Sequence, residues 1–267
     1  MATIQRLSDR VVRTIAAGEV IDSLAAAVRE LAENALDAGA SRLAVDISPD
    51  RGYVRLADNG CGMDKANLRL AALPHTTSKI GDCEDLSRIG SLGFRGEALH
   101  GLARLSRLQV ASRPRDGVGW RVRYAETGET LSLETAAIAP GTIVTIGDLF
   151  ANWPARKEGL PPAARQMKAV QETIVHLSLC HPAIAWQVCR DDRRWFSISP
   201  GRNAIDILSQ VMRSIRPSDL QYLQWELDVG VNGVDPSFPN TERANAIRPY
   251  IELTVGLPDR CHRRRLD

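Results

Sequence analysis

The chain has 267 residues, 44% hydrophobic and 25% charged, which is enough to bury the core of one large domain and part of another. The net charge is only +2, and the five cysteines form no CxxC pair, so a disulfide framework and a zinc finger are both disfavoured. We find neither a secretory leader nor an apolar run of bilayer length, and we therefore expect a cytoplasmic protein with no membrane partner.

The first predicted element is a helix over residues 23–38, SLAAAVRELAENALDA. Ser23 is placed to cap its start and Gly39 to end it. Apolar residues recur on one side at helical spacing, namely at Leu24, Val28, Leu31 and Ala35. This segment is therefore expected to pack one face against a core.

The remaining pattern is mixed α and β. Alternating apolar residues predict strands at 43–47, 53–57, 108–112, 119–125 and 142–146. Helical spacing predicts helices at 64–73, 96–105 and 163–180. Pro/Gly stretches and a long loop over 230–245 follow, and we predict two domains, 1–202 and 203–267.

The helix over 23–38 also carries a polar stripe. Glu30, Asn34 and Asp37 are spaced so that they share one face. Such a stripe is commonly a solvated face. Glu is also a plausible general base for water, and an Asn oxygen is a hard ligand for Mg²⁺ beside phosphates, so phosphoanhydride hydrolysis is a second interpretation.

Two loops offer polar groups to a nucleotide. Asp58 ends a strand, and Asn59, Gly60 and Gly62 follow in a turn where a flat ligand can approach the backbone. A carboxylate there can accept from an exocyclic amine such as that of adenine. The loop of Thr77, Ser78 and Lys79 offers hydroxyls and an ammonium. Without other evidence, the stretch after Asp58 is simply a good turn, and the stretch of Thr77, Ser78 and Lys79 is simply a polar loop.

The stretch 91–99, SLGFRGEAL, fits neither the dinucleotide fingerprint nor the P-loop. Its glycines precede a predicted helix, where unpaired backbone amides and the helix dipole favour an anion. We interpret it as a phosphate lid.

These motifs together closely resemble the N-terminal ATPase region of MutL mismatch-repair proteins, which belong to the GHKL ATPases. The resemblance is carried by IAAGEVI (15–21), VRELAENALDAGA (28–40), DNGCGM (58–63), HTTSKI (75–80), SLGFRGEAL (91–99) and LFANWPAR (149–156). It is strong over about the first 160 residues. It implies a GHKL (Bergerat) two-layer α/β sandwich followed by a partial ribosomal S5-like second domain.

The resemblance also implies roles for single residues, with ATP and Mg²⁺ as cofactors. Glu30 matches the catalytic base that activates water, Asn34 the magnesium ligand and Asp58 the adenine-binding aspartate. The lid of the family matches Gly93, Phe94, Arg95, Gly96, Glu97, Ala98 and Leu99. The rest of the implied ATP site comprises Asp37, Gly60, Gly62, Met63, Thr77, Ser78, Lys79 and Thr142.

The sequence departs from the family in three respects. Ser23-Leu24 replaces the usual Arg-Pro of the family. Residues 151–154, Ala-Asn-Trp-Pro, replace the usual Tyr-Asn-Thr-Pro. The chain also reaches Asp267 without the HPxK motif, whose lysine reaches the γ-phosphate in the family. We therefore expect weak, impaired ATPase activity in this chain.

The resemblance implies a DNA mismatch repair ATPase in which nucleotide closes the lid and joins two N-terminal domains. Its implied partners are DNA bound without sequence preference, a mismatch-recognition protein of the MutS type, and a second copy held by this contact and by a missing C-terminal region. The implied location is the bacterial cytoplasm, at the nucleoid. The alternative is a nucleotide-binding regulatory module without turnover. A phosphotransfer kinase is disfavoured because no separate His-bearing helix accompanies the pocket.

Overall fold

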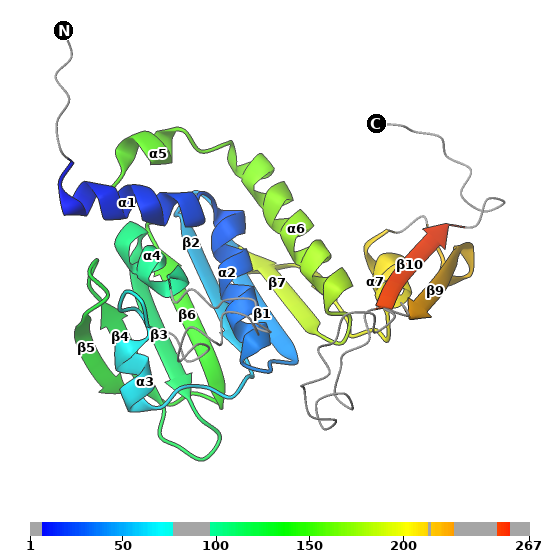
Figure 1. The fold of residues 1–267 in the computed structure, drawn as a ribbon, viewed down its shortest axis with the longest axis horizontal. Helices are drawn as coiled ribbons and strands as arrows, with labels where there is room; N and C mark the ends of the chain where they lie inside the picture. The colour runs from blue at the N-terminus through cyan, green and yellow to red at the C-terminus, as the bar shows by residue number, and fades with distance from the viewer. Residues whose placement is uncertain (1–6, 77–96, 213–214, 227–249, 257–267) are drawn as a thin grey trace, which may run out of the picture.

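The centre of the molecule is an eight-stranded mixed sheet, shown in Figure 1. The computed structural model describes residues 7–76, 97–212, 215–226 and 250–256. The strands lie in the order β5-β4-β3-β6-β2-β1-β7-β8. Their bounds are Arg42–Ser48 (β1), Tyr53–Asp58 (β2), Arg107–Arg113 (β3), Trp120–Tyr124 (β4), Thr130–Thr135 (β5), Gly141–Gly147 (β6), Ala185–Arg190 (β7) and Arg193–Ile198 (β8).

Helices form the second layer on one face of this sheet (Figure 1). Their bounds are Asp9–Val20 (α1), Leu24–Asp37 (α2), Lys65–Leu70 (α3), Ala98–Leu105 (α4), Pro154–Glu158 (α5), Ala163–Cys180 (α6) and Ala204–Val211 (α7). A short 3-10 helix, Pro217–Asp219 (η2), leads into a separate two-stranded sheet of Leu220–Glu226 (β9) and Tyr250–Gly256 (β10). The predicted two-layer α/β sandwich is confirmed.

The cap residues of α2 explain its limits. The Ser23 hydroxyl accepts from the Ala26 amide at 3.1 Å, which satisfies one of the unpaired donors at the helix start. At the other end, Gly39 has a φ of +73°, a backbone conformation that favours glycine. Both ends lie where the sequence predicted them.

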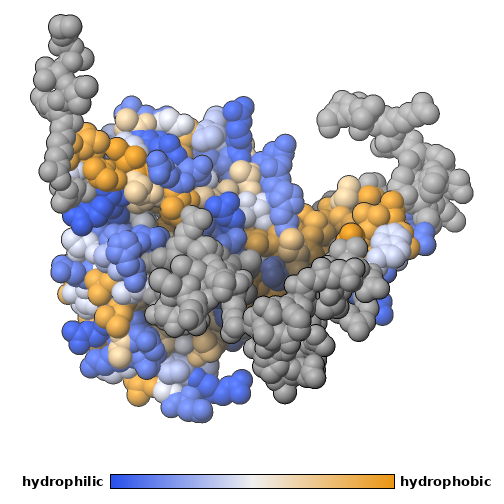
Figure 2. Space-filling view, viewed as in Figure 1, coloured by the Kyte–Doolittle hydropathy of each residue, from blue (hydrophilic) through white to orange (hydrophobic). Residues whose placement is uncertain are grey.

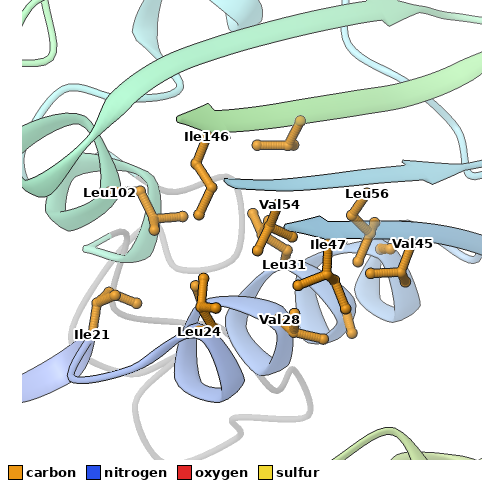
Figure 3. Close-up of a cluster of buried hydrophobic side chains, with 14 of the residues drawn as sticks. Ile21, Leu24, Val28, Leu31, Val45, Ile47, Val54, Leu56, Leu102 and Ile146 are labelled. Carbon is orange, nitrogen blue, oxygen red and sulfur yellow. The ribbon is translucent and has the colours of Figure 1, made fainter. Parts of the chain in front are cut away.

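The apolar stripe of α2 packs on the neighbouring strands β1 and β2 (Figure 3). Figure 3 shows Leu24, Val28 and Leu31 facing Val45, Ile47, Val54 and Leu56 of β1 and β2, and each of these side chains is buried. Burying one such side chain contributes about 1.5–3 kcal/mol. This contact fixes α2 across the sheet and so sets where its polar residues lie.

Long-range pairing decides the sheet order. β1 pairs antiparallel with β2 and parallel with β7, which lies far along the chain. β6 lies between β2 and β3 and is antiparallel to both. The ends of β2, β6 and β3 therefore meet, although they come from three distant parts of the sequence.

The predicted strands and helices are all present, with ends that match or are shifted by up to three residues; the largest shift is in the 64–73 helix, which ends at Leu70. The sequence prediction missed α1, β5, β7, β8, β9 and β10, and the short helices α5, α7 and η2. The predicted loop over 230–245 lies outside the described residues. The domain boundary near residue 202 and the S5-like assignment stay predictions. In the described part of the chain, no helix combines the length and apolar character needed to span a bilayer.

Candidate functional site

Three polar side chains lie in a row at the end of the core face of the sheet. Residues alternate along each strand, so Asp58 follows buried Val54 and Leu56, and Thr142 precedes buried Val144 and Ile146. Ser112 likewise follows Leu108 and Val110. Ser112 pairs with Thr142 in the β3–β6 register. Where the apolar face ends, the sheet therefore presents a polar row.

Asp58 is anchored by two backbone amides. Its Oδ1 accepts from Gly60 N at 2.8 Å and from Thr142 N at 3.2 Å. Burial raises the pKa of the Asp58 carboxyl, and these two hydrogen bonds partly offset that effect. Among the described residues, both bonds end on Oδ1, so Oδ2 is the oxygen placed to accept from a ligand.

The loop after Asp58 needs its glycines because backbone lies close on both sides. A Cβ on Gly60 would lie 2.8 Å from Ala38 O. Gly62 has a φ of +70°, and a Cβ there would lie 2.1 Å from Arg113 O. The DNGCG stretch is thus a tightly packed connection against the end of α2 and β3, and no larger residue fits these positions.

The same loop is tied to neighbouring elements. The Asn59 side-chain oxygen accepts from Ser41 N at 2.9 Å and Arg42 N at 2.8 Å. Cys61 N donates to Ala38 O at 2.9 Å. The carboxyl end of α2 is therefore held beside Asp58, which joins the predicted helix motif and the predicted turn in one site.

The polar stripe of α2 lies at the edge of the helix–sheet contact. Glu30, Asn34 and Asp37 are half-buried, and the Glu30 side chain is only 17% exposed. Arg29 Nη2 lies 3.3 Å from Glu30 Oε1. A solvated helix face would be far more exposed, so burial argues against that interpretation. Within the described residues, no cluster of three His, Cys, Asp or Glu side chains could hold a metal ion.

Part of the predicted phosphate site lies outside the described residues, namely Thr77, Ser78, Lys79, Gly93, Phe94, Arg95 and Gly96. Glu97 precedes α4, and Ala98 and Leu99 form its first turn. Glu97 Oε1 lies 2.8 Å from His75 Nδ1, so the residues on either side of 77–96 meet. The first predicted loop, 75–80, therefore begins at the contact where the second, 91–99, ends.

A groove of about 200 Å³ lies elsewhere, where α1, α2 and α6 meet. Glu19, Asp22 and Arg29 contribute its charged lining. Because Asp58 and Gly60 lie at the opposite end of α2, this groove is separate from the polar row.

Sequence reasoning missed Ser112, a fully buried residue that contacts both Thr142 and the Met63 amide. Its only signal was the alternation of LQVAS, which places Ser112 on the face of Leu108 and Val110. Trp153, one of the departures from the family, packs partly buried against the core. Its ring lies so close to Gly18 of α1 that a Cβ there would be 2.5 Å from Trp153 Cζ3.

Comparisons with known proteins agree with this geometry. Residues 22–137 match the family described as histidine kinase-, DNA gyrase B- and HSP90-like ATPase. The chain is 52% identical to the DNA mismatch repair protein MutL of Trichormus variabilis over 266 residues, covering 100% of this chain and 46% of that protein. The chain therefore spans about half the length of this curated relative.

Solved structures share the fold. The N-terminal domain of a DNA repair protein matches with a TM-score of 0.68 and 26% identity, over 83% of this chain and 67% of that one. The ATPase domain of Aquifex aeolicus MutL complexed with ADP matches with a TM-score of 0.61 and 24% identity, over 78% of this chain and 74% of that one. The chain thus belongs to the MutL family of DNA mismatch repair proteins, with a GHKL-type ATPase domain as its fold.

Proposed function

We propose that this chain binds ATP with Mg²⁺ and hydrolyses it slowly, as the nucleotide-responsive part of a mismatch-repair protein. The observation that carries the proposal is the Asp58 carboxylate, half-buried at the end of the core face and held by Gly60 N and Thr142 N. Such an oriented acceptor matches the exocyclic amine of adenine.

The reaction we propose is attack of water on the γ-phosphate. Glu30 accepts the proton of the attacking water, and its limited exposure keeps the carboxylate in one place. Asn34, one turn later, supplies an amide oxygen that suits Mg²⁺ together with phosphate oxygens and water. When bound, the ion neutralises phosphate charge. The remaining proposed ATP contacts are Asp37, Gly60, Gly62, Met63, Thr77, Ser78, Lys79, Thr142 and the lid, residues 93–99.

The proposed partners are DNA, a mismatch-recognition protein of the MutS type, and a second copy of the chain, in the bacterial cytoplasm at the nucleoid. In this proposal, nucleotide joins two N-terminal domains, and a C-terminal region of the longer protein forms a second contact. The α1 helix supports the first contact, because Val11, Val12 and Ile15 are 43%, 49% and 40% exposed, and apolar side chains gather over it in Figure 2.

The alternative is a nucleotide-binding regulatory module without turnover. A half-buried Glu30 favours the ATPase, because a binding module has no need of a base there. Slow turnover by these 267 residues stays a prediction. It is checked by comparing their ATP hydrolysis with that of a longer chain that carries the family's HPxK lysine. Equal rates would contradict it.

The test of the proposed function is thermal unfolding with a non-hydrolysable ATP analogue, with and without Mg²⁺. A ligand at a hundred times its dissociation constant stabilises the native state by about 2.7 kcal/mol, which shifts the midpoint clearly. GTP serves as the matched control ligand. No shift with the ATP analogue, or an equal shift with GTP, would contradict adenine recognition by Asp58.

A further inference from the structure

The carboxylate of Glu30 is held from one side by the preceding residue of α2. Arg29 Nη2 lies 3.3 Å from Glu30 Oε1, and the two side chains are 50% and 17% exposed. Consecutive residues of a helix point about 100° apart, so the arginine has to bend around the helix to reach this oxygen. The contact is therefore not a consequence of helical spacing, unlike the i,i+4 pair of Lys168 and Glu172 on α6.

The groove between α1, α2 and α6 explains which side of Glu30 the guanidinium occupies. Arg29 lines this groove together with the carboxylates of Glu19 and Asp22. Asp22 Oδ1 accepts from Ser23 Oγ at 2.8 Å, which fixes that carboxylate at the start of α2. The two acids attract the guanidinium toward the groove. Arg29 therefore approaches Glu30 from the groove side of the helix, away from the polar row.

This arrangement gives the two oxygens of the Glu30 carboxylate different roles. Among the described residues, the hydrogen bond to this carboxylate ends on Oε1, so Oε2 is the oxygen placed to accept from a water molecule. A charge-assisted hydrogen bond limits the rotation of an otherwise flexible glutamate side chain. Position matters for a general base, because it must lie within hydrogen-bond reach of the proton that it accepts, and a displacement of about 1 Å can cost about a hundredfold in rate.

We propose that Arg29 is a positioning residue, which holds the Glu30 carboxylate so that its second oxygen faces the attacking water. The inference rests on the proposed function, in which Glu30 is the base. Because one guanidinium nitrogen makes the contact, a lysine at the same place can replace it, whereas a neutral side chain cannot. Half of the Arg29 side chain is exposed, so the ion pair contributes little to the stability of the fold.

The experiment measures ATP hydrolysis with Mg²⁺ by the whole chain, for the parent, Arg29→Gln and Arg29→Lys. Glutamine and lysine are both good helix formers, so both variants are expected to fold. Arg29→Gln should lower kcat about tenfold and leave KM for ATP unchanged, because the base contributes only in the transition state. Arg29→Lys should keep most of the parental kcat. The matched control is Lys168→Gln, which removes another ion pair from a helix surface and should leave kcat unchanged.

A second measurement tests whether Arg29 acts through Glu30. In the Glu30→Ala background, Arg29→Gln should cause no further loss of turnover, because the effects of residues that act as a unit do not add. A further loss in that background would overturn the inference. Parental kcat in Arg29→Gln, a rise in KM with kcat unchanged, or equal losses in Arg29→Gln and Arg29→Lys would each overturn it as well.

The failure of this inference and the failure of the proposed function are distinguishable. A parent that does not hydrolyse ATP, or a Glu30→Ala variant that hydrolyses it at the parental rate, contradicts the proposed function. A parent whose turnover depends on Glu30 but not on Arg29 contradicts only the role of Arg29.

Discussion

The amide of Thr142 donates to the carboxylate of Asp58 at 3.2 Å, although 84 residues separate them in the chain. The contact exists because β6 pairs with β2: Ala57 lies opposite Ile143, so the next residues meet at the end of the sheet. It brings together the aspartate of the DNGCG turn and a threonine at the start of β6.

The raised pKa of Asp58 predicts how stability depends on pH. The folded carboxyl holds its proton more tightly than the unfolded one, so its contribution to the free energy of unfolding falls as pH rises from its ordinary pKa through the raised value. Asp58→Asn keeps an oxygen for both amides and removes the buried charge. We expect the ligand-free variant to be at least as stable as the parent at pH 7, with the difference shrinking below pH 4.

Asp206→Asn is the control, because the pH dependence of stability expected from Asp206 has the opposite sign. Hydrogen bonds from Arg202 lower the pKa of the half-buried Asp206 carboxyl. Its stabilising contribution is present above the ordinary pKa and is lost as pH falls through the lowered value. Urea unfolding at several pH values checks both, and a loss of stability in Asp58→Asn at pH 7 would contradict the account of Asp58.

The proposed base gives the second prediction. Glu30→Ala should bind an ATP analogue with Mg²⁺ as the parent does, because the base acts on water and contributes little to the bound nucleotide. Turnover should fall by about 10²–10⁴-fold. Phosphate release under single-turnover conditions checks it. Hydrolysis at the parental rate would exclude Glu30 as the base.

Two glycines with similar backbone conformations give the third prediction. Gly62→Ala should destabilise the fold by about 3 kcal/mol or more, because left-handed strain of about 1–2 kcal/mol adds to overlap with Arg113 O. Gly39→Ala has nothing within 4 Å of the new Cβ and should show only the strain. Chemical denaturation measures both. Equal losses would mean that the DNGCG turn is not close-packed.

The contact between Trp153 and Gly18 gives the fourth prediction. Gly18→Ala should destabilise by about 1–3 kcal/mol, because the ring cannot move away without disturbing the packing of α5 on α1. Adding Trp153→Ala should relieve most of that loss. Gly101→Ala in α4 is the control, since its Cβ meets only ordinary contacts, and it should stabilise by up to about 1 kcal/mol. If the stability losses of Gly18→Ala and Trp153→Ala simply add in the double variant, that result would contradict the contact between the two residues.

Local signals explain what the sequence could predict. The helix α2 was found with both ends because Ser23 and Gly39 act within one turn of the chain. The order of the strands was not predictable in this way, because the parallel pairing joins β1 to β7, a strand far along the chain that local signals cannot connect to it. β7 and β8 were missed although Trp186 and Ile198, buried at their ends, pair in the register.

The residues of the candidate site also differ in whether local sequence signals could identify them. Asp58 and Gly62 stood out because an acid and small residues follow a strand pattern. Ser112 did not, because a serine at the end of an alternating run is ordinary until the partner strand brings Thr142 beside it. The raised pKa of Asp58 likewise depends on burial, which only the assembled sheet supplies.

The measurement that tests the central claim most directly is calorimetric titration of a non-hydrolysable ATP analogue, with Mg²⁺, into the parent and into Asp58→Ala. Removing the carboxylate leaves the adenine amine without its acceptor and the amides of Gly60 and Thr142 without theirs. We predict saturable binding to the parent and no detectable binding to the folded variant. Equal affinity for both proteins would contradict the assignment of Asp58 as the residue that recognises adenine.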